Sequence, residues 1–326
     1  MENILLNIKD LHIWYRVYGG YLKIINSVYL MVREGERVGL VGESGCGKTT
    51  VMKSIPQILP PGDFLIPKGE IYYKGKDILK MNFSEIQRLR SREIAMIFQD
   101  PTAALNPVFT IGTQIGDVIR YSAALEENVH QEKIKMLSIK ALKEVSLPDP
   151  ERMLVNYPFQ LSGGMKQRVC IAMSTSSPRN LIIADEPGTS LDVTIQDQIM
   201  RLLNEIVKKR KTSLLLITHS LGVAKEMTDR IYIMYAGTIV ETALTKDLFQ
   251  NPVHPYTKGL LASVPRLSGG GIARGIPGRI PDYLNPPQGC RFQPRCEYAT
   301  SSCTENPPQL IEVEKDHFVA CYLTQR

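Results

Sequence analysis

Alternating hydrophobic and polar positions open the chain and predict antiparallel strands in residues 4 to 32. A Gly19-Gly20 pair interrupts this pattern and predicts a break between two strands. A second hairpin is expected over Gly69 to Ile78, where a Lys-Gly-Lys turn separates two runs rich in β-forming residues. The pattern therefore predicts an antiparallel β subdomain early in the chain.

Uninterrupted apolar runs predict strands of another kind, buried inside an α/β core. Between these runs the period becomes helical, and Asp100 to about Tyr157 predict a helical subdomain, placed at roughly 100–165. A long amphipathic helix is expected to reach about Lys211. The combination predicts an α/β fold. The apolar runs are residues 38–41, 93–99, 181–187 and 213–218.

A glycine-rich turn, VGLVGESGCGKTT at 38–50, joins the first apolar run to a helix that should end near Pro56. It fits GxxxxGK[ST], the phosphate-binding loop. Its glycines let backbone N–H groups point at an anion, and the helix start adds the positive end of its dipole. Lys48 is expected to reach the terminal phosphates and Thr49 to bind Mg²⁺. A structural turn that binds nothing is the alternative, which the complete pattern disfavours.

Polar residues stand at the ends of the other apolar runs. Asp185 can hold Mg²⁺ through water, and its neighbour Glu186 can accept a proton from an attacking water. Gln99 can contact metal or water in a nucleotide site, although a lone amide is more often a surface residue. His219 follows the last apolar run. Together these ends predict a nucleotide-hydrolysing site.

A second anion-binding helix start is predicted at LSGGMKQR, 161–168, where Ser162, Gly163 and Gly164 offer backbone N–H groups and a hydroxyl. Tyr15 and Tyr18 precede the phosphate-binding loop, and either ring can stack on a nucleobase or merely pack a strand face.

Composition identifies a globular protein rather than a disordered one. Of 326 residues, 43% are hydrophobic and 22% charged, and the net charge of +6 is not concentrated in a long basic run. No apolar stretch approaches the roughly 20 residues that span a bilayer, and the start lacks a basic region followed by an apolar one. We therefore expect a cytosolic protein that reaches membranes only through partners.

Six cysteines in a reducing compartment are not expected to form disulfides. Cys46 lies in the phosphate-binding loop and Cys170 on an apolar helix face, so neither needs a metal. His317 could substitute for a cysteine as a metal ligand, but it is expected at the surface. The tail, Leu267 to Arg326, is poor in apolar residues, so a bound metal is expected to stabilise its fold. Its cysteine spacings fit zinc poorly and leave zinc, an iron–sulfur cluster or free thiols open. These cysteines are Cys290, Cys296, Cys303 and Cys321.

The order of these motifs resembles the ATPase subunits of ABC transporters over roughly residues 1–250. This resemblance implies a RecA-like phosphate-loop core with the β subdomain, the helical subdomain and a cysteine-bearing extension over 251–326. It further implies ATP and Mg²⁺ bound between two head-to-tail subunits, with Ser162 and Gly164 contributed in trans. Glu186, His219, Gln99 and Lys48 are then catalytic, and Thr49, Gln99 and Asp185 bind Mg²⁺. The remaining implied nucleotide contacts are Gly42, Ser44, Gly45, Cys46, Gly47, Thr50, Gly163 and Asp192, with Tyr15 or Tyr18 on the base.

Three segments resemble the oligopeptide/dipeptide and nickel importer branch: FQDPTAALNPVFTIG, NPVHPYTKGLLASVP at Asn251 to Pro265, and the cysteine-bearing tail. Met165 replaces the glutamine of the commonest signature but also occurs in this branch, and Gly188 is a second departure. The branch implies a [4Fe–4S] cluster on the four tail cysteines. It also implies that the loop after Gln99 abuts the coupling helix of a membrane subunit.

The implied partners are two membrane permeases, an extracytoplasmic solute-binding protein and a second ATPase, favoured as a paralogue. The chain would then act peripherally at the cytoplasmic face of the membrane. Peptides are the expected solute, with oligosaccharides or nickel as alternatives. A soluble ABC ATPase working on DNA, ribosomes or cluster assembly is disfavoured. Such proteins tend to carry two cassettes, a coiled-coil insertion or a basic arm, whereas this sequence shows one cassette and none of these features. No nucleic-acid partner is expected.

Overall fold

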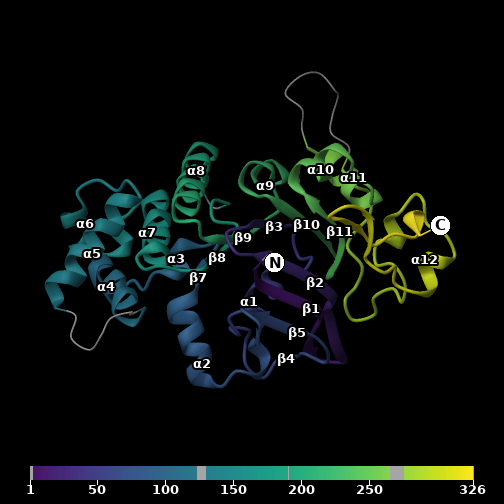
Figure 1. Cartoon of the computed structure of the whole chain (residues 1–326), viewed down its shortest axis with the longest axis horizontal. Coiled ribbons are helices and arrows are strands. Elements are labelled where there is room, and N and C mark those ends of the chain that lie inside the picture. The colour runs from purple at the N-terminus through teal and green to yellow at the C-terminus, as the bar shows by residue number, and fades with distance from the viewer. Residues whose placement is uncertain (1–2, 123–129, 190, 265–274, 326) are drawn as a thin grey trace. The chain divides into compact units, whose positions relative to one another are not determined.

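The computed structural model describes residues 3–122, 130–189, 191–264 and 275–325 (Figure 1). The chain divides into two compact units. One consists of the described residues up to Lys80 and from Ile217 onward, and the other of residues 81–216. Both units combine strands with helices, as the sequence predicts.

Two long antiparallel strands, β1 (Ile4–Val17) and β2 (Gly20–Arg33), form the first sheet of the first unit. Alternate side chains such as Leu6 and Ile8, and beyond a register shift Leu11 and Ile13, are almost fully buried, which explains the period of two in the sequence. The early strands and the second hairpin are confirmed. The smaller strands of this sheet are β4 (Phe64–Leu65), β5 (Glu70–Tyr73) and β6 (Lys76–Asp77), followed by a 3-10 turn at Ile78–Lys80.

A second sheet of this unit centres on β10 (Arg230–Tyr235), every residue of which is buried. β3 (Arg37–Val41) runs parallel to β10, and β11 (Thr238–Leu244) pairs with β10 antiparallel. The extension adds β13 (His317–Val319) and β12 (Ile311–Glu314) to this sheet. The helices are α1 (Lys48–Ser54), α9 (Leu221–Met227), α10 (Thr245–Gln250), α11 (Pro255–Ala262) and α12 (Ser302–Glu305), with 3-10 turns at Gln293–Arg295 and Tyr322–Thr324.

An aromatic cluster packs the extension against β10. The Tyr235 ring centroid lies 4.7 Å from that of Tyr256 in α11 and 5.0 Å from that of Phe292. All three side chains are buried. Aromatic pairs of this kind add about 0.5–1.5 kcal/mol beyond the area they bury. The C-terminal extension thus shares an apolar core with β10 of the same unit.

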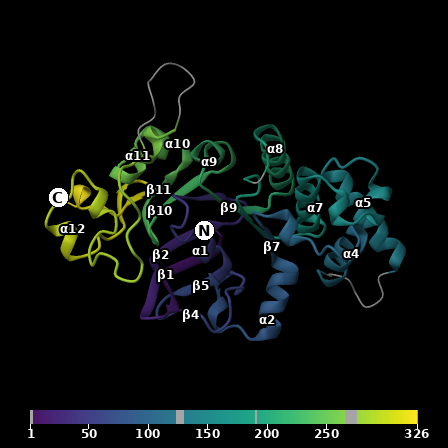
Figure 2. The same cartoon turned by 180° about the vertical axis from the view of Figure 1, so that it is seen from behind.

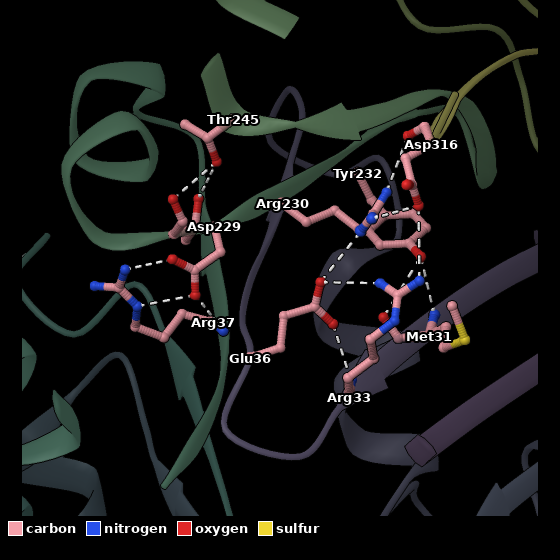
Figure 3. Close-up of polar contacts among 10 residues, drawn as sticks. Met31, Arg33, Glu36, Arg37, Asp229, Arg230, Tyr232, Thr245 and Asp316 are labelled. Carbon is pink, nitrogen blue, oxygen red and sulfur yellow. Dashed lines mark hydrogen bonds and ion pairs between the residues drawn. The ribbon is translucent and has the colours of Figure 1, made fainter. Parts of the chain in front are cut away.

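A polar network fixes a second part of the extension, the turn between β12 and β13 (Figure 3). Arg230 is 4% exposed at its side chain and donates to Glu36 at 3.2 Å and to the Asp316 carboxylate at 3.1 Å. Arg33 lies within ion-pair distance of both carboxylates. Each buried charge is therefore paired, as burial requires.

The expectation that His317 lies at the surface is wrong. Its side chain is buried, and Nε2 lies 2.8 Å from Oε1 of Glu241, which is itself fully buried. The same carboxylate accepts the backbone N–H groups of Val253 and His254. His317 therefore satisfies a buried charge that would otherwise be costly.

Parallel strands form the sheet of the second unit. β7 (Ile94–Ile97) pairs in parallel with β8 (Leu181–Asp185), and β9 (Ser213–Thr218) follows β8 in the strand order, its last two residues falling in the first unit. The buried strands predicted from the apolar runs are confirmed. The helices before the LSGGM segment are α2 (Phe83–Arg88), a π-helical turn at Leu89–Glu93, α3 (Pro101–Ala104), α4 (Ile111–Tyr121), α5 (Gln131–Glu144) and α6 (Pro150–Val155), followed by a 3-10 turn at Pro158–Gln160.

Two further helices of this unit, α7 (Gly163–Thr175) and α8 (Val193–Arg210), begin at capping side chains. The hydroxyl of Ser162 accepts the N–H of Met165, and the carboxylate of Asp192 accepts the N–H of Ile195. Figure 2 shows α4, α5 and α7 grouped together within this unit. The expected helical content between Asp100 and Tyr157 is confirmed for the residues described.

Candidate functional site

The glycine-rich loop leaves the buried end of β3 and leads into α1, as a phosphate-binding loop requires. Gly42 passes so close to β10 that an added Cβ would lie 2.1 Å from the carbonyl oxygen of Met234. Gly45 has φ of +79°, a backbone conformation that L-residues rarely adopt. Close packing therefore favours glycine at position 42, and the backbone conformation favours it at position 45.

Lys48 lies inside this loop rather than pointing into solvent. Its side chain is buried, and Nζ donates to the carbonyl oxygens of Gly42 at 2.8 Å and Glu43 at 3.0 Å. The ammonium group is thus held among the backbone groups that would surround a phosphate.

Side-chain exposure separates the other loop positions. Ser44 and Thr49 are exposed, whereas Cys46 is fully buried. Burial raises the pKa of the Cys46 thiol, so it stays protonated at neutral pH. Only the backbone of Cys46 is therefore available to a phosphate.

In the second unit, two of the predicted catalytic residues lie together. Nε2 of Gln99 is 3.4 Å from Oε2 of Glu186, and the hydroxyl of Thr189 donates to the same oxygen at 3.0 Å. Asp185 ends β8 and is 5% exposed, while Glu186 takes a left-handed conformation with φ of 44°. This turn directs Glu186 away from the strand path that Asp185 still follows. Sequence reasoning missed Thr189, and only its position three residues after Glu186 offered a signal.

The LSGGM helix start is exposed on the second unit. Ser162 and Gly163 are exposed, and Gly164 is half-buried in the first turn of α7. The helix has 13 residues, and its first N–H groups are only partly satisfied by the Ser162 hydroxyl. This geometry suits an anion presented by another molecule.

Each half of the predicted nucleotide site is described within its own unit. Lys48, Thr49 and the exposed His219 belong to the first, whereas Gln99, Asp185, Glu186 and Ser162 belong to the second. Of the candidate base-stacking residues, Tyr15 is half-buried opposite Leu22, and Tyr18 is fully exposed beside the β1–β2 turn. Both remain predictions.

The four tail cysteines all line one cavity of about 250 Å³. Burial, with a smaller contribution from the neighbouring Cys303 and Cys321, raises the pKa of Cys290 to about 11. Within the described ranges, no group of three or more His, Cys, Asp or Glu side chains is arranged to hold a metal ion. The donor type and shared cavity match the predicted cluster, but the arrangement gives the iron–sulfur prediction no support.

Sequence reasoning also missed three contacts that the extension makes with the phosphate-binding loop. The hydroxyl of Tyr256 accepts the N–H of Glu43, the hydroxyl of Tyr283 donates to the carbonyl of Gly45, and Arg295 pairs with the Glu43 carboxylate. The partners are more than 200 positions apart in the chain. No local pattern could have linked them.

Comparison with known proteins gives two family matches. Residues 25–189 match the model described as ABC transporter, and residues 240–303 match the oligopeptide/dipeptide transporter C-terminal region. The dipeptide transport ATP-binding protein DppD of Bacillus subtilis is 42% identical, covering 99% of this chain and 95% of the relative. The oligopeptide transport ATP-binding protein OppD of the same species is 43% identical, covering 98% and 88%.

Solved structures show the same fold. The ATP-binding cassette MJ0796, solved as a dimer in a post-hydrolysis state with ADP and Pi, superposes with a TM-score of 0.66 at 24% identity. The match covers 74% of this chain and 99% of that cassette. In the part of the chain that the structure describes, no helix combines the length and apolar character needed to span a bilayer.

Proposed function

Because the chain belongs to the family of ABC transporter ATP-binding subunits and carries the C-terminal region of the oligopeptide/dipeptide transporters, we propose that it hydrolyses ATP to drive peptide import through membrane permeases. The observation that carries this proposal is the match to peptide-transport relatives over nearly the whole chain, extension included. These relatives favour peptides over oligosaccharides or nickel. They also favour a transport role over a soluble ATPase acting on nucleic acid.

The phosphate-binding half of the proposed site is preorganised. Lys48 and the loop backbone from Ser44 to Thr49 would neutralise the β- and γ-phosphates of ATP. Thr49, Gln99 and Asp185 offer hydroxyl, amide and carboxylate oxygens, the donor chemistry that Mg²⁺ prefers. When bound, Mg²⁺ would neutralise charge on the phosphate oxygens.

Glu186 is the proposed general base. It would accept a proton as water attacks the γ-phosphorus and the bond to the bridging oxygen breaks, releasing ADP and phosphate. Gln99 and Thr189 both donate to its carboxylate and would orient it. His219 is assigned to the γ-phosphate and water geometry. We therefore assign Gln99 and Thr189 the role of orienting the Glu186 carboxylate for catalysis.

A second ATPase subunit would complete the site. At the N-terminus of α7, Ser162 is exposed and its hydroxyl accepts the N–H of Met165, while Gly164 lies half-buried in the first turn close to Ile195. We assign this N-terminus to the γ-phosphate held by a facing subunit, favoured as a paralogue, in head-to-tail pairing. The test is whether a Glu186→Gln variant pairs with its paralogue when ATP is added. Adding Ser162→Arg to that variant should abolish the pairing.

An exposed apolar surface on the second unit fits the permease. Val108 and Phe109 are 70% and 50% exposed, and Val155 and Phe159 are 68% and 72% exposed. The N–H of Ile111 donates to the carbonyl of Asn156, which brings the two segments side by side. Such clusters mark interaction sites. We assign this one to the coupling helix of a membrane subunit, which would place the chain at the cytoplasmic face of the membrane.

Reconstitution tests the peptide-import proposal. The chain, its paralogue and two permeases in proteoliposomes should hydrolyse ATP faster when the solute-binding protein carries a peptide. Stimulation by oligosaccharide or nickel, with none by peptide, would overturn the substrate assignment. Phe109→Asp should abolish stimulation while leaving ATP binding by the isolated chain intact. The matched control is Phe83→Asp, which changes another exposed phenylalanine of the same unit.

The iron–sulfur cluster remains a prediction that no step above uses. Its test is the iron and sulfide content of the chain purified without oxygen, compared with a Cys303→Ser variant. Absence of both elements from the parent chain would exclude it.

A further inference from the structure

The phosphate-binding loop is held from outside by side chains of the C-terminal extension. The N–H of Glu43 donates to the Tyr256 hydroxyl at 3.1 Å, and the Tyr283 hydroxyl donates to the carbonyl of Gly45 at 2.8 Å. Nη1 of Arg295 lies 3.0 and 3.2 Å from the two carboxylate oxygens of Glu43. All of these residues belong to the first unit. Two adjacent turns of the loop are therefore fixed by residues beyond position 250.

Arg295 is the most heavily bonded of these side chains. Its Nε donates to the carbonyl of Pro277 at 2.8 Å and its Nη2 to the carbonyl of Ile276 at 3.0 Å. The guanidinium also lies 5.6 Å from the centre of the Tyr235 ring. Only 5% of the side chain is exposed. A planar group with five fixed donors suits this position, and lysine could not reproduce the contacts.

Glu43 is an unexpected residue in a loop that binds a polyanion. Its carboxylate is 29% exposed and lies one residue after Gly42, whose carbonyl contacts the Lys48 ammonium. An unpaired carboxylate here would repel the phosphates of ATP, because charges near a protein surface still interact over several ångströms. The Arg295 guanidinium neutralises that carboxylate and anchors it at the same time.

We propose that Arg295, assisted by Tyr283, is a positioning residue for the phosphate-binding loop, through which the C-terminal extension sets the affinity of the chain for ATP. This inference rests on the proposed ATPase function. Arg295 touches no substrate; it acts through Glu43. The extension then supports the nucleotide site in addition to packing against the rest of the first unit. Arg295 also precedes Cys296 directly. One short segment, 290–296, therefore lines the cysteine-lined cavity and also contacts the phosphate-binding loop.

The test is a charge cycle between Arg295 and Glu43, read as the Kd for ATP of the full-length chain by titration calorimetry. Arg295→Gln should weaken binding about tenfold, because one uncompensated negative charge remains beside the phosphates. Glu43→Gln should tighten binding modestly, since it leaves the guanidinium unopposed. The double variant should return to within about threefold of the parent.

A matched control separates positioning from general tethering of the tail. Asp316→Asn removes a carboxylate that ties the extension to Arg230 in the network of Figure 3, which contains no residue of the phosphate-binding loop. It should leave the Kd for ATP unchanged. Tyr283→Phe removes only the hydroxyl on Gly45 and should weaken binding about threefold. This variant keeps the proposal testable if Arg295→Gln fails to fold.

Saturating ATP distinguishes affinity from chemistry. In the assembled transporter, Arg295→Gln should raise KM with kcat within about twofold of the parent. The proposal fails if Arg295→Gln binds ATP as tightly as the parent, or if Glu43→Gln gives no recovery in the double variant. It also fails if Asp316→Asn weakens binding equally. Failure of the parent chain itself to bind ATP would instead contradict the proposed function.

Discussion

The phosphate-binding loop and the Glu186 turn are held in contrasting ways. The loop lies between a buried strand and the extension, with Lys48 buried and Glu43 clamped by Arg295. The Glu186 turn relies on Gln99 and Thr189, both exposed. Lys48 is thus held by buried contacts, whereas the half-buried carboxylate of Glu186 accepts hydrogen bonds from two exposed side chains.

This contrast matches the demands on each half. A phosphate cradle gains from rigidity, because preorganised donors need no reorganisation when the anion arrives. In the proposed function Glu186 acts when a second subunit closes over ATP, so exposed donors such as Gln99 and Thr189 can adjust as the site closes. We therefore expect substitutions in the loop to alter binding or folding, and substitutions at the Glu186 turn to alter turnover.

The largest expected effect is at Glu186. Glu186→Gln should slow ATP turnover by about 10²–10⁴-fold, because the amide cannot accept the proton of the attacking water. ATP binding should remain. Steady-state phosphate release and the Kd for ATP provide the two measurements. Thr189→Ala, which removes one donor to the same carboxylate, should cost about tenfold in turnover.

A turnover within threefold of the parent for Glu186→Gln would show that another group takes the proton. Such a result would also remove the reason to regard Thr189 as orienting.

Lys48→Ala should show the opposite pattern, a loss of binding. Removing the buried ammonium should weaken ATP binding by about 10²-fold, since charge-assisted contacts to phosphate are among the strongest in proteins. The Kd for ATP is again the measurement. Lys53→Ala, at the last turn of the same helix, is the control and should bind ATP normally. Equal loss in both variants would mean that helix stability, not phosphate contact, was affected.

The packing of the loop predicts a stability difference between two of its glycines. Gly42→Ala should lower the free energy of unfolding by about 3 kcal/mol, because its Cβ would meet the Met234 carbonyl. Gly45→Ala should cost about 1 kcal/mol, because only its positive φ opposes a side chain and the added Cβ would meet no atom within 4 Å beyond its chain neighbours. Urea unfolding measures both. Equal costs would refute the claim that β10 confines the loop.

The elements that could be predicted from the sequence are those with local causes. The period of two in β1 and β2, the glycines of the loop and the helix start at Ser162 depend on neighbours within a few residues. The burial of His317 depends instead on Glu241, 76 positions away, and the loop clamp on a pair separated by 252 positions. Such contacts arise only from the tertiary fold, so no local sequence pattern predicted them.

The smallest expected effect concerns the extension and pH. Burial lowers the pKa of His254 to about 3, from an ordinary 6.5, and its Nδ1 accepts the N–H of Tyr256. Below pH 6.5 the unfolded chain binds a proton that the folded chain excludes, so the stability should fall by about 1 kcal/mol per pH unit. Above pH 6.5 both states are neutral at this residue and the contribution is constant.

His254→Asn isolates this contribution, because the asparagine oxygen can still accept the Tyr256 N–H but does not titrate. All other residues are the same in both proteins, so the difference between their slopes of unfolding free energy from pH 5 to 6.5 reports on His254 alone. The parent should lose about 1.5 kcal/mol more than the variant over that range. Identical slopes would show that the His254 imidazole gains a proton in the folded extension, and that this part of the tail is more open to water than the phosphate-binding loop it supports.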